Sequence, residues 1–201
     1  MSEVSAVLVR ELREKTNAGI MDCKRALAEN DGDMEKAVVF LREKGLAAAA
    51  KKAARGATDG AVSSYIHAGG KIGVLIEVNC ETDFVARTDE FQGLVRNLAM
   101  QVAASNPLYV KKDDVPEEAL EAERKIFRAQ AAESGKPANV IEKMVDGKVT
   151  KYFAEACLLE QPFVKDPQCT VGQLVVDAIA KIGENIVVRR FARFQLGDSA
   201  D

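Results

Sequence analysis

The sequence predicts an α+β protein in which a module of three helices precedes a three-stranded antiparallel sheet covered by helices. Two features of the apolar pattern indicate this class. Up to Gly45 the apolar residues recur every three or four positions, which is the spacing of amphipathic helices. From Ile72 to Cys80 they alternate with other residues, which is the spacing of a strand with one apolar face. Helical spacing then returns, so helices are available to cover the sheet.

Three amphipathic repeats occupy residues 1–45, and each is followed by a glycine typical of a helix end, at Gly19, Gly32 and Gly45. Their apolar positions are Val4, Leu8 and Leu12; Ile20, Cys23 and Leu27; and Met34, Ala37, Val38 and Leu41. Asp33 is the expected N-cap of the third helix. Because each apolar stripe is too narrow to stabilise a lone helix, we expect the three helices to pack together as one module.

Residues 46–60 are predicted to form a helical linker. The segment LAAAAKKAAR, residues 46–55, favours a helix by propensity but has little apolar surface to bury. Asp59-Gly60 is a turn signal, and we expect it to separate this linker from the first strand.

The remaining residues, 61–201, are predicted to form a second domain built on three strands. The strands are expected at 61–67, 72–80 and 186–196. Ala68-Gly69-Gly70 supplies a hairpin turn between the first two. Three strands with one apolar face need helices against that face, and the sequence offers them.

Two helices of this domain have apolar faces wide enough to cover a small sheet. Thr88 is the expected N-cap of the first, which ends before Pro107. A capping box that begins at Thr170 starts the second, and Gly183 ends it.

An inserted antiparallel pair of helices is predicted at about 115–150. Pro116 opens an acidic first turn, and Gly135-Lys136-Pro137 interrupts the helical pattern. The pattern returns with Ile141 and Met144, so we expect two helices joined by a short turn.

Composition and charge exclude several classes of function. The chain has 28 basic and 31 acidic residues, and the net charge of −3 argues against a nucleic-acid binder. Its four cysteines form no C-x-x-C pair, so zinc-finger and thioredoxin spacings are absent. No stretch approaches the ~18 apolar residues of a membrane span, and the start does not resemble a signal peptide. We therefore expect a cytoplasmic protein with reduced cysteines.

No catalytic, metal or cofactor site is predicted. The sequence lacks the G-x-x-x-x-G-K-[ST] and G-x-G-x-x-G motifs that hold nucleotide phosphates. His67 is the one histidine, and no cysteine or serine suited to nucleophilic attack accompanies it. We interpret it as a residue of the surface or the hairpin tip. Cys23 and Cys80 fall on apolar faces and are interpreted as core residues.

The segment ETDFVAR, residues 81–87, leaves two interpretations open. It is expected to be a loop between a strand and a helix, with Phe84 placed between acidic and basic residues. In one interpretation Phe84 plugs the end of the core and Val85 staples the start of the helix. In the other, Phe84 is exposed and anchors the binding of another protein.

Three long motifs follow one another along the chain: VRELREKTNAGIMDCKRAL, EVNCETDFVAR and KIGENIVVRRF. Together with SGKP and EQPFVKD, they resemble bacterial elongation factor Ts over essentially the whole chain. The resemblance implies a guanine-nucleotide exchange factor that binds elongation factor Tu in its GDP-bound and nucleotide-free states. It also implies that the first helices form a ubiquitin-associated-like module that docks on the GTPase domain of elongation factor Tu.

The same resemblance implies which residues touch the partner. In the family, Phe84 wedges between side chains of the GTPase domain, and Asp83 helps to move a helix and to loosen magnesium coordination. The residues implied to make contact are Thr82, Asp83, Phe84 and Val85; Arg13, Ile20 and Met21; and Ile182 and Gly183.

Longer members of the family carry two copies of the sheet–helix unit and a C-terminal helical module, whereas this sequence carries one copy. A three-stranded sheet has two edges and one weakly covered face, so we predict a homodimer formed through the sheet. No direct nucleic-acid or membrane partner is expected. Two other functions remain open: a helical adaptor for a different protein, and a small hydrolase that uses His67 with Asp83 or Glu81.

Overall fold

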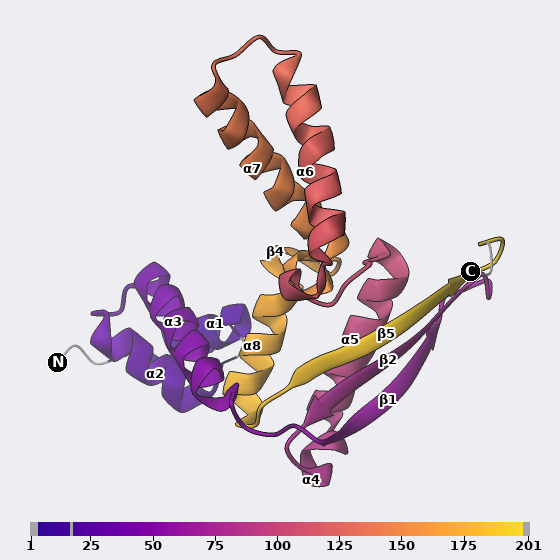
Figure 1. The fold of residues 1–201 in the computed structure, drawn as a ribbon. Helices are drawn as coiled ribbons and strands as arrows, with labels where there is room; N and C mark the ends of the chain where they lie inside the picture. The colour runs from indigo at the N-terminus through magenta and orange to yellow at the C-terminus, as the bar shows by residue number, and fades with distance from the viewer. Residues whose placement is uncertain (1–3, 17, 199–201) are drawn as a thin grey trace. The chain divides into compact units, whose positions relative to one another are not determined.

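A computed structural model describes residues 4–16 and 18–198, and its elements confirm an α+β protein (Figure 1). The helices are α1 (Ala6–Thr16), α2 (Ile20–Glu29), α3 (Met34–Lys52), α4 (Asp83–Ala86), α5 (Asp89–Ser105), α6 (Glu117–Ala132), α7 (Ala138–Ala156) and α8 (Val171–Ile182), with 3-10 turns at Lys112–Asp114 and Leu158–Glu160. The strands are β1 (Asp59–Ile66), β2 (Ile72–Cys80), β3 (Pro162–Phe163), β4 (Asp166–Thr170) and β5 (Val187–Gln195).

The chain divides into two compact units, each of which contains a part of the three-stranded sheet. The first unit comprises the chain up to Val62, Glu77–Val95 and Gln173–Val188. The second comprises Ser63–Ile76, Arg96–Gly172 and the chain from Arg189 onward. The first unit thus joins the N-terminal helices to α4 and α8, which are distant from them in sequence.

The helices α1, α2 and α3 share one apolar core, as their narrow stripes predict. Its fully buried side chains are Leu12, Cys23, Ala26, Leu27 and Ala37. The predicted cap of α3 is confirmed, since the Asp33 carboxylate accepts the backbone N–H groups of Glu35 at 3.0 Å and Lys36 at 3.1 Å. Burial raises the pKa of the Cys23 thiol, so this cysteine stays protonated as a core residue.

The prediction that the third helix ends at Gly45 is wrong, because α3 continues to Lys52 and takes in half of the expected linker. Gly45 is buried against α8. A Cβ atom at this position would lie 3.8 Å from side-chain atoms of both Ala180 and Val176. The Lys52 ammonium group also donates to the carbonyl of Ile179 at 3.3 Å. The glycine therefore serves close helix packing, and burial against α8 extends the helix beyond it.

The order of strands in the antiparallel sheet is β1-β2-β5. The central strand β2 has the predicted bounds, and its buried side chains alternate as predicted: Val74, Ile76, Val78 and Cys80. The turn between β1 and β2 is also where it was expected. It is closed by bonds from the His67 N–H to the Ile72 carbonyl and from the Gly70 N–H to the His67 carbonyl, both 2.9 Å.

The turn predicted at Asp59-Gly60 is wrong, because both residues belong to β1. Gly60 has φ +138°, a conformation that favours glycine. A Cβ atom here would lie 2.2 Å from the Val78 carbonyl oxygen. Glycine is required because the backbone of β1 approaches β2 closely at this point, which a turn signal does not reveal.

In the second unit, α6 and α7 lie side by side (Figure 1). An ion pair joins them, with the Arg128 guanidinium donating to Glu142 at 2.8 and 3.1 Å. The segment extends past the predicted end near residue 150, because the buried stripe of α7 continues to Ala156. The small antiparallel pair of β3 and β4 was not predicted, since Pro162 and Pro167 obscure the strand pattern.

Candidate partner-binding site

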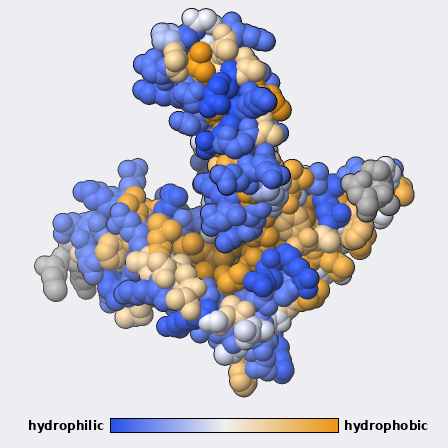
Figure 2. All heavy atoms as spheres, in the orientation of Figure 1, coloured by the Kyte–Doolittle hydropathy of each residue, from blue (hydrophilic) through white to orange (hydrophobic). Residues whose placement is uncertain are grey.

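The T-D-F-V motif forms most of α4, a single helical turn in place of the expected loop. Thr82 is its N-cap, and its side-chain oxygen accepts the Val85 N–H at 3.4 Å. Phe84 is 81% exposed, whereas Ala86 is only 6% exposed and packs inward. Of the two interpretations of this segment, the structure therefore supports the exposed aromatic residue. Figure 2 shows a small patch of hydrophobic surface at α4, next to hydrophilic surface.

The side chains around Phe84 are held by short-range bonds. Asp83 forms an ion pair with Arg87, one turn later, at 2.9 Å. Val85 is half-buried, and its carbonyl accepts the Thr88 hydroxyl at 2.8 Å. That hydroxyl oxygen also accepts the N–H of Phe91 at 3.2 Å, which confirms Thr88 as the cap of α5. The turn is thus tied at its far end to the helix that follows.

At its near end the turn is held by Glu184, from the K-I-G-E-N segment. The Glu184 carboxylate accepts the Thr82 hydroxyl at 2.7 Å. It also accepts the backbone N–H groups of Glu81 and Thr82, both at 3.0 Å. Hydrogen bonds to a charged acceptor are stronger than neutral ones, so this is a firm attachment between segments a hundred residues apart.

A reciprocal set of bonds joins the same two segments. The Glu81 carboxylate accepts the Asn185 N–H at 2.6 Å and lies 3.5 Å from the Arg55 guanidinium. The Asn185 side chain, which is 4% exposed, donates to the Arg55 carbonyl at 2.8 Å. Beneath them, burial and the nearby charge of Glu184 raise the pKa of the Cys80 thiol to about 11, so Cys80 stays protonated and inert.

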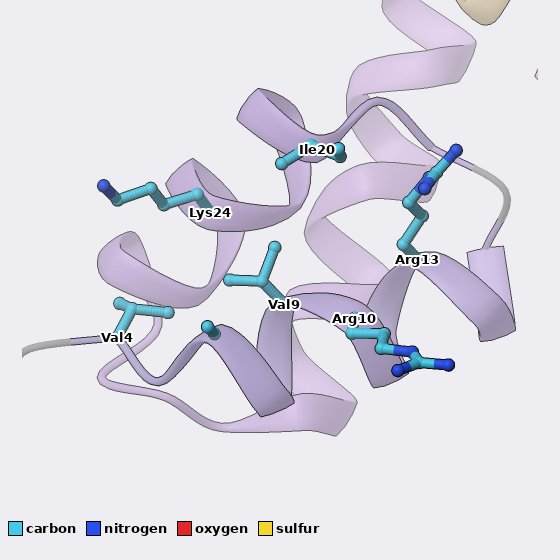
Figure 3. A pocket seen from close by; sticks show the side chains of 7 residues that line it. Val4, Val9, Arg10, Arg13, Ile20 and Lys24 are labelled. Carbon is cyan, nitrogen blue, oxygen red and sulfur yellow. The ribbon is translucent and has the colours of Figure 1, made fainter.

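A second feature is an open hollow of about 390 Å³ between α1 and α2 (Figure 3). Its lining residues are Val4, Ala6, Val9, Arg10, Arg13, Ile20 and Lys24. Figure 3 shows Val9 of α1 directed toward the gap below Ile20, with Arg10 and Arg13 at one end. Two predicted contact residues, Arg13 and Ile20, therefore share one apolar depression with a basic rim. The third, Met21, is exposed beside Ile20 in α2.

All nine residues predicted to contact the partner belong to the first compact unit. Ile182 is half-buried at the end of α8, and Gly183 ends that helix with φ +92° and a 3.0 Å bond from its N–H to the Ile179 carbonyl. The residue after it, Glu184, reaches the T-D-F-V turn. Sequence reasoning assigned no role to Glu184 or Asn185, and a polar pair after a helix-ending glycine was the only available signal.

The three residues of the hydrolase alternative, His67, Asp83 and Glu81, each have another partner in the structure. His67 shares a 3.1 Å hydrogen bond with the Tyr65 hydroxyl, while Asp83 pairs with Arg87 and Glu81 with Asn185. Across residues 4–16 and 18–198, no group of three or more histidine, cysteine, aspartate or glutamate side chains is arranged to hold a metal ion. Within the same ranges, no helix is both long and apolar enough to cross a membrane.

An exposed aromatic ring on a turn held at both ends and an apolar hollow with a basic rim are features typical of protein-binding surfaces. Comparison with known proteins identifies the family. The Elongation factor TS family model matches residues 13–178. The chain is 63% identical to elongation factor Ts of Carboxydothermus hydrogenoformans, over 97% of this chain and 90% of that protein. It is 60% identical to the one of Caldanaerobacter subterraneus, over 98% and 99%. The chain belongs to the elongation factor Ts family.

Proposed function

We propose that this chain is a guanine-nucleotide exchange factor for elongation factor Tu and acts in the cytoplasm during translation elongation. Family membership supports the partner, since the relatives are elongation factors Ts. The observation that carries the mechanism is Phe84, which is exposed on a turn that is held at both ends. A side chain presented in this way can enter a partner with little loss of conformational entropy.

Exchange of this kind requires no covalent chemistry. The chain binds the nucleotide-free GTPase more tightly than the nucleotide-filled one, and by reciprocity it weakens nucleotide binding by the same factor. Phe84 inserts into the GTPase domain, and Asp83 helps to displace a helix there and to loosen Mg²⁺ coordination. Mg²⁺ is the largest local charge in such a site, so its displacement removes much of the hold on GDP. Binding of GTP then expels the factor.

The docking surface supplies the remaining affinity. Burying one phenylalanine contributes on the order of 1.5–3 kcal/mol, which is too little to offset tight nucleotide binding alone. We assign the rest to the N-terminal module of residues 1–45, with Arg13, Ile20 and Met21, and to Ile182 and Gly183. The apolar hollow between α1 and α2 fits an apolar side chain, and its basic rim fits nearby acidic groups.

We also propose that residues 61–201 dimerise through the sheet. In the second unit the sheet exposes large apolar side chains at Ile66, Leu75, Phe194 and Leu196, which line one shallow hollow. A second copy that covers this surface would bury it and protect the sheet edges.

The test of the exchange function is release of labelled GDP from elongation factor Tu by the intact chain, Phe84→Ala and Asp83→Ala. Exchange by insertion predicts slower release with both variants, while their folding is unchanged because both side chains are accessible. Leu108→Ala is a matched control, because Leu108 is also exposed but lies outside the proposed contacts. The adaptor alternative predicts that Phe84→Ala releases GDP as fast as the intact chain does.

A further inference from the structure

We propose that Glu184 is a positioning residue, which sets the direction in which Phe84 projects toward the partner. This inference rests on the proposed exchange function and extends it, because Glu184 acts through the turn and touches neither the nucleotide nor Phe84's target. The Glu184 carboxylate holds both the backbone N–H and the side-chain hydroxyl of Thr82, the residue that caps α4, together with the backbone N–H of Glu81.

The direction of Phe84 depends on the backbone of the turn. With 81% of its surface exposed, the ring has little packing of its own to fix it. The turn is one helical turn long, so it has little intrinsic stability. The Thr82 hydroxyl couples Glu184 to the backbone of α4, because it donates to the Glu184 carboxylate and its oxygen accepts the Val85 N–H. Removing the carboxylate frees two backbone N–H groups and this hydroxyl at once.

Glu184 also stands at the end of a continuous path from the docking helices. Gly183 ends α8 in a left-handed conformation, and Glu184 follows it. Within the same unit α8 is attached to α3 by a 3.1 Å bond from the Arg42 guanidinium to Gln173 and by the close packing at Gly45. The helix α3 shares its core with α1 and α2. The Glu184 attachment thus links the Phe84 turn to this unit, alongside the bonds that Asn185 makes to Glu81 and Arg55.

The test is a double-mutant cycle on GDP release from elongation factor Tu. Glu184→Ala is expected to slow stimulated GDP release about tenfold or more. Glu184→Gln is expected to slow it less, because the amide keeps one acceptor oxygen. If Glu184 acts through Phe84, adding Glu184→Ala to Phe84→Ala changes the rate by less than about twofold. When Glu184→Ala is combined with Met21→Ala, which lies at the separate docking surface, the two fold-reductions in release rate are expected to multiply. Glu133→Ala, an exposed glutamate at the end of α6, is the control.

A second measurement uses no partner. Hydrogen exchange in folded Glu184→Ala is expected to accelerate at the amides of Glu81, Thr82 and Val85, while those of the α1–α3 core keep their protection. Thr82→Val, which keeps the shape but loses the hydroxyl, is expected to accelerate Val85 alone among the three. Unchanged exchange at all three amides in Glu184→Ala overturns the proposal.

The outcomes separate the inference from the function on which it rests. If Phe84→Ala slows release but Glu184→Ala does not, or if the two effects multiply, Glu184 does not position Phe84 and the exchange function stands. If the intact chain fails to accelerate GDP release, the proposed nucleotide-exchange function is wrong. The hydrogen-exchange measurements then decide by themselves whether Glu184 holds the turn.

Discussion

Phe84 illustrates how a single residue can be costly to expose and yet be kept at the surface. A large apolar side chain that is 81% exposed contributes little to folding, and we propose that it serves partner binding instead. Its neighbours explain how it stays there: Ala86 takes the inward position, and Thr82 and Thr88 close the turn on either side. The residue is thus presented by bonds that leave its ring free.

Replacing Phe84 by alanine should separate binding from stability. We expect the thermal midpoint of Phe84→Ala to match that of the intact chain, because no buried contact is lost. The dissociation constant for nucleotide-free elongation factor Tu should rise at least about tenfold, since burial of the ring is worth about 1.5–3 kcal/mol. Titration calorimetry measures the dissociation constant, and thermal unfolding measures the midpoint. A fall in the thermal midpoint with unchanged affinity would assign Phe84 to the core.

Asp177 in α8 provides a test at acidic pH. Burial raises the pKa of this carboxyl group, against the hydrogen bond from Gln173 at 2.8 Å and the charge of Arg42. A folded-state pKa above the unfolded one favours the folded state at low pH, and this contribution is lost as pH rises through the folded pKa. Asp177→Asn keeps an acceptor for Gln173 and should therefore raise the thermal midpoint at pH 7.

The advantage of Asp177→Asn should shrink as the pH falls through the raised folded-state pKa of Asp177, because the native carboxyl group then becomes protonated as well. Thermal unfolding from pH 3 to 7 measures the difference. A constant difference over this range would show that the charge of Asp177 has no part in stability.

At the scale of elements, the packing of α3 on α8 decides where α3 ends. The glycine at position 45 looks like a stop signal, but its neighbours in space, Val176 and Ala180, lie more than 130 positions away. Small residues allow two helices to approach, and the buried contact then outweighs the poor helix propensity of glycine. This contact joins the N-terminal helices to α8, the helix that ends just before Glu184.

Substitutions at Gly45 should show both effects. Gly45→Ala places a methyl group at ordinary contact distance, 3.8 Å, and removes a glycine from a helix interior. We expect a gain of about 0.5–1 kcal/mol in the free energy of unfolding. Gly45→Leu should cost about 1–3 kcal/mol through overpacking. Urea unfolding measures both, and equal behaviour of the two variants would contradict close packing against α8.

Gly147 supplies the matched control, because it is exposed within α7 and has open space where a Cβ would lie. Alanine and leucine should both stabilise the chain there, since only helix propensity changes. A loss of stability in Gly147→Leu would mean that leucine is unfavourable for a reason other than crowding at α8.

Elements set by local pattern were predictable, and those set by distant contacts were not. The alternation along β2 predicted its bounds, and Asp33 and Thr88 were recognisable as caps, because each depends on residues within a few positions. The site was predictable in part. The residues around Phe84 stand out as a motif, but the sequence did not decide whether the Phe84 side chain is buried or exposed. The role of Glu184 depends on bonds to residues 102 and 103 positions away, which periodicity cannot reveal.

At the scale of the whole molecule, the exposed apolar surface of the sheet predicts self-association. Light scattering at micromolar concentration should give twice the chain mass of 21.7 kDa. Phe194→Lys with Leu196→Lys should give a single chain, because charges cannot be buried unpaired in such an interface. The same change at exposed Leu108 should leave the dimer intact. A single-chain mass for the unmodified protein would rule out the dimer.

The most direct measurement of the central claim is the release of labelled GDP from elongation factor Tu as the concentration of the intact chain is raised. Coupled binding predicts that release accelerates and then saturates, and that adding free Mg²⁺ opposes it. Release that stays at its spontaneous rate at every concentration, although the chain is folded, would contradict the account.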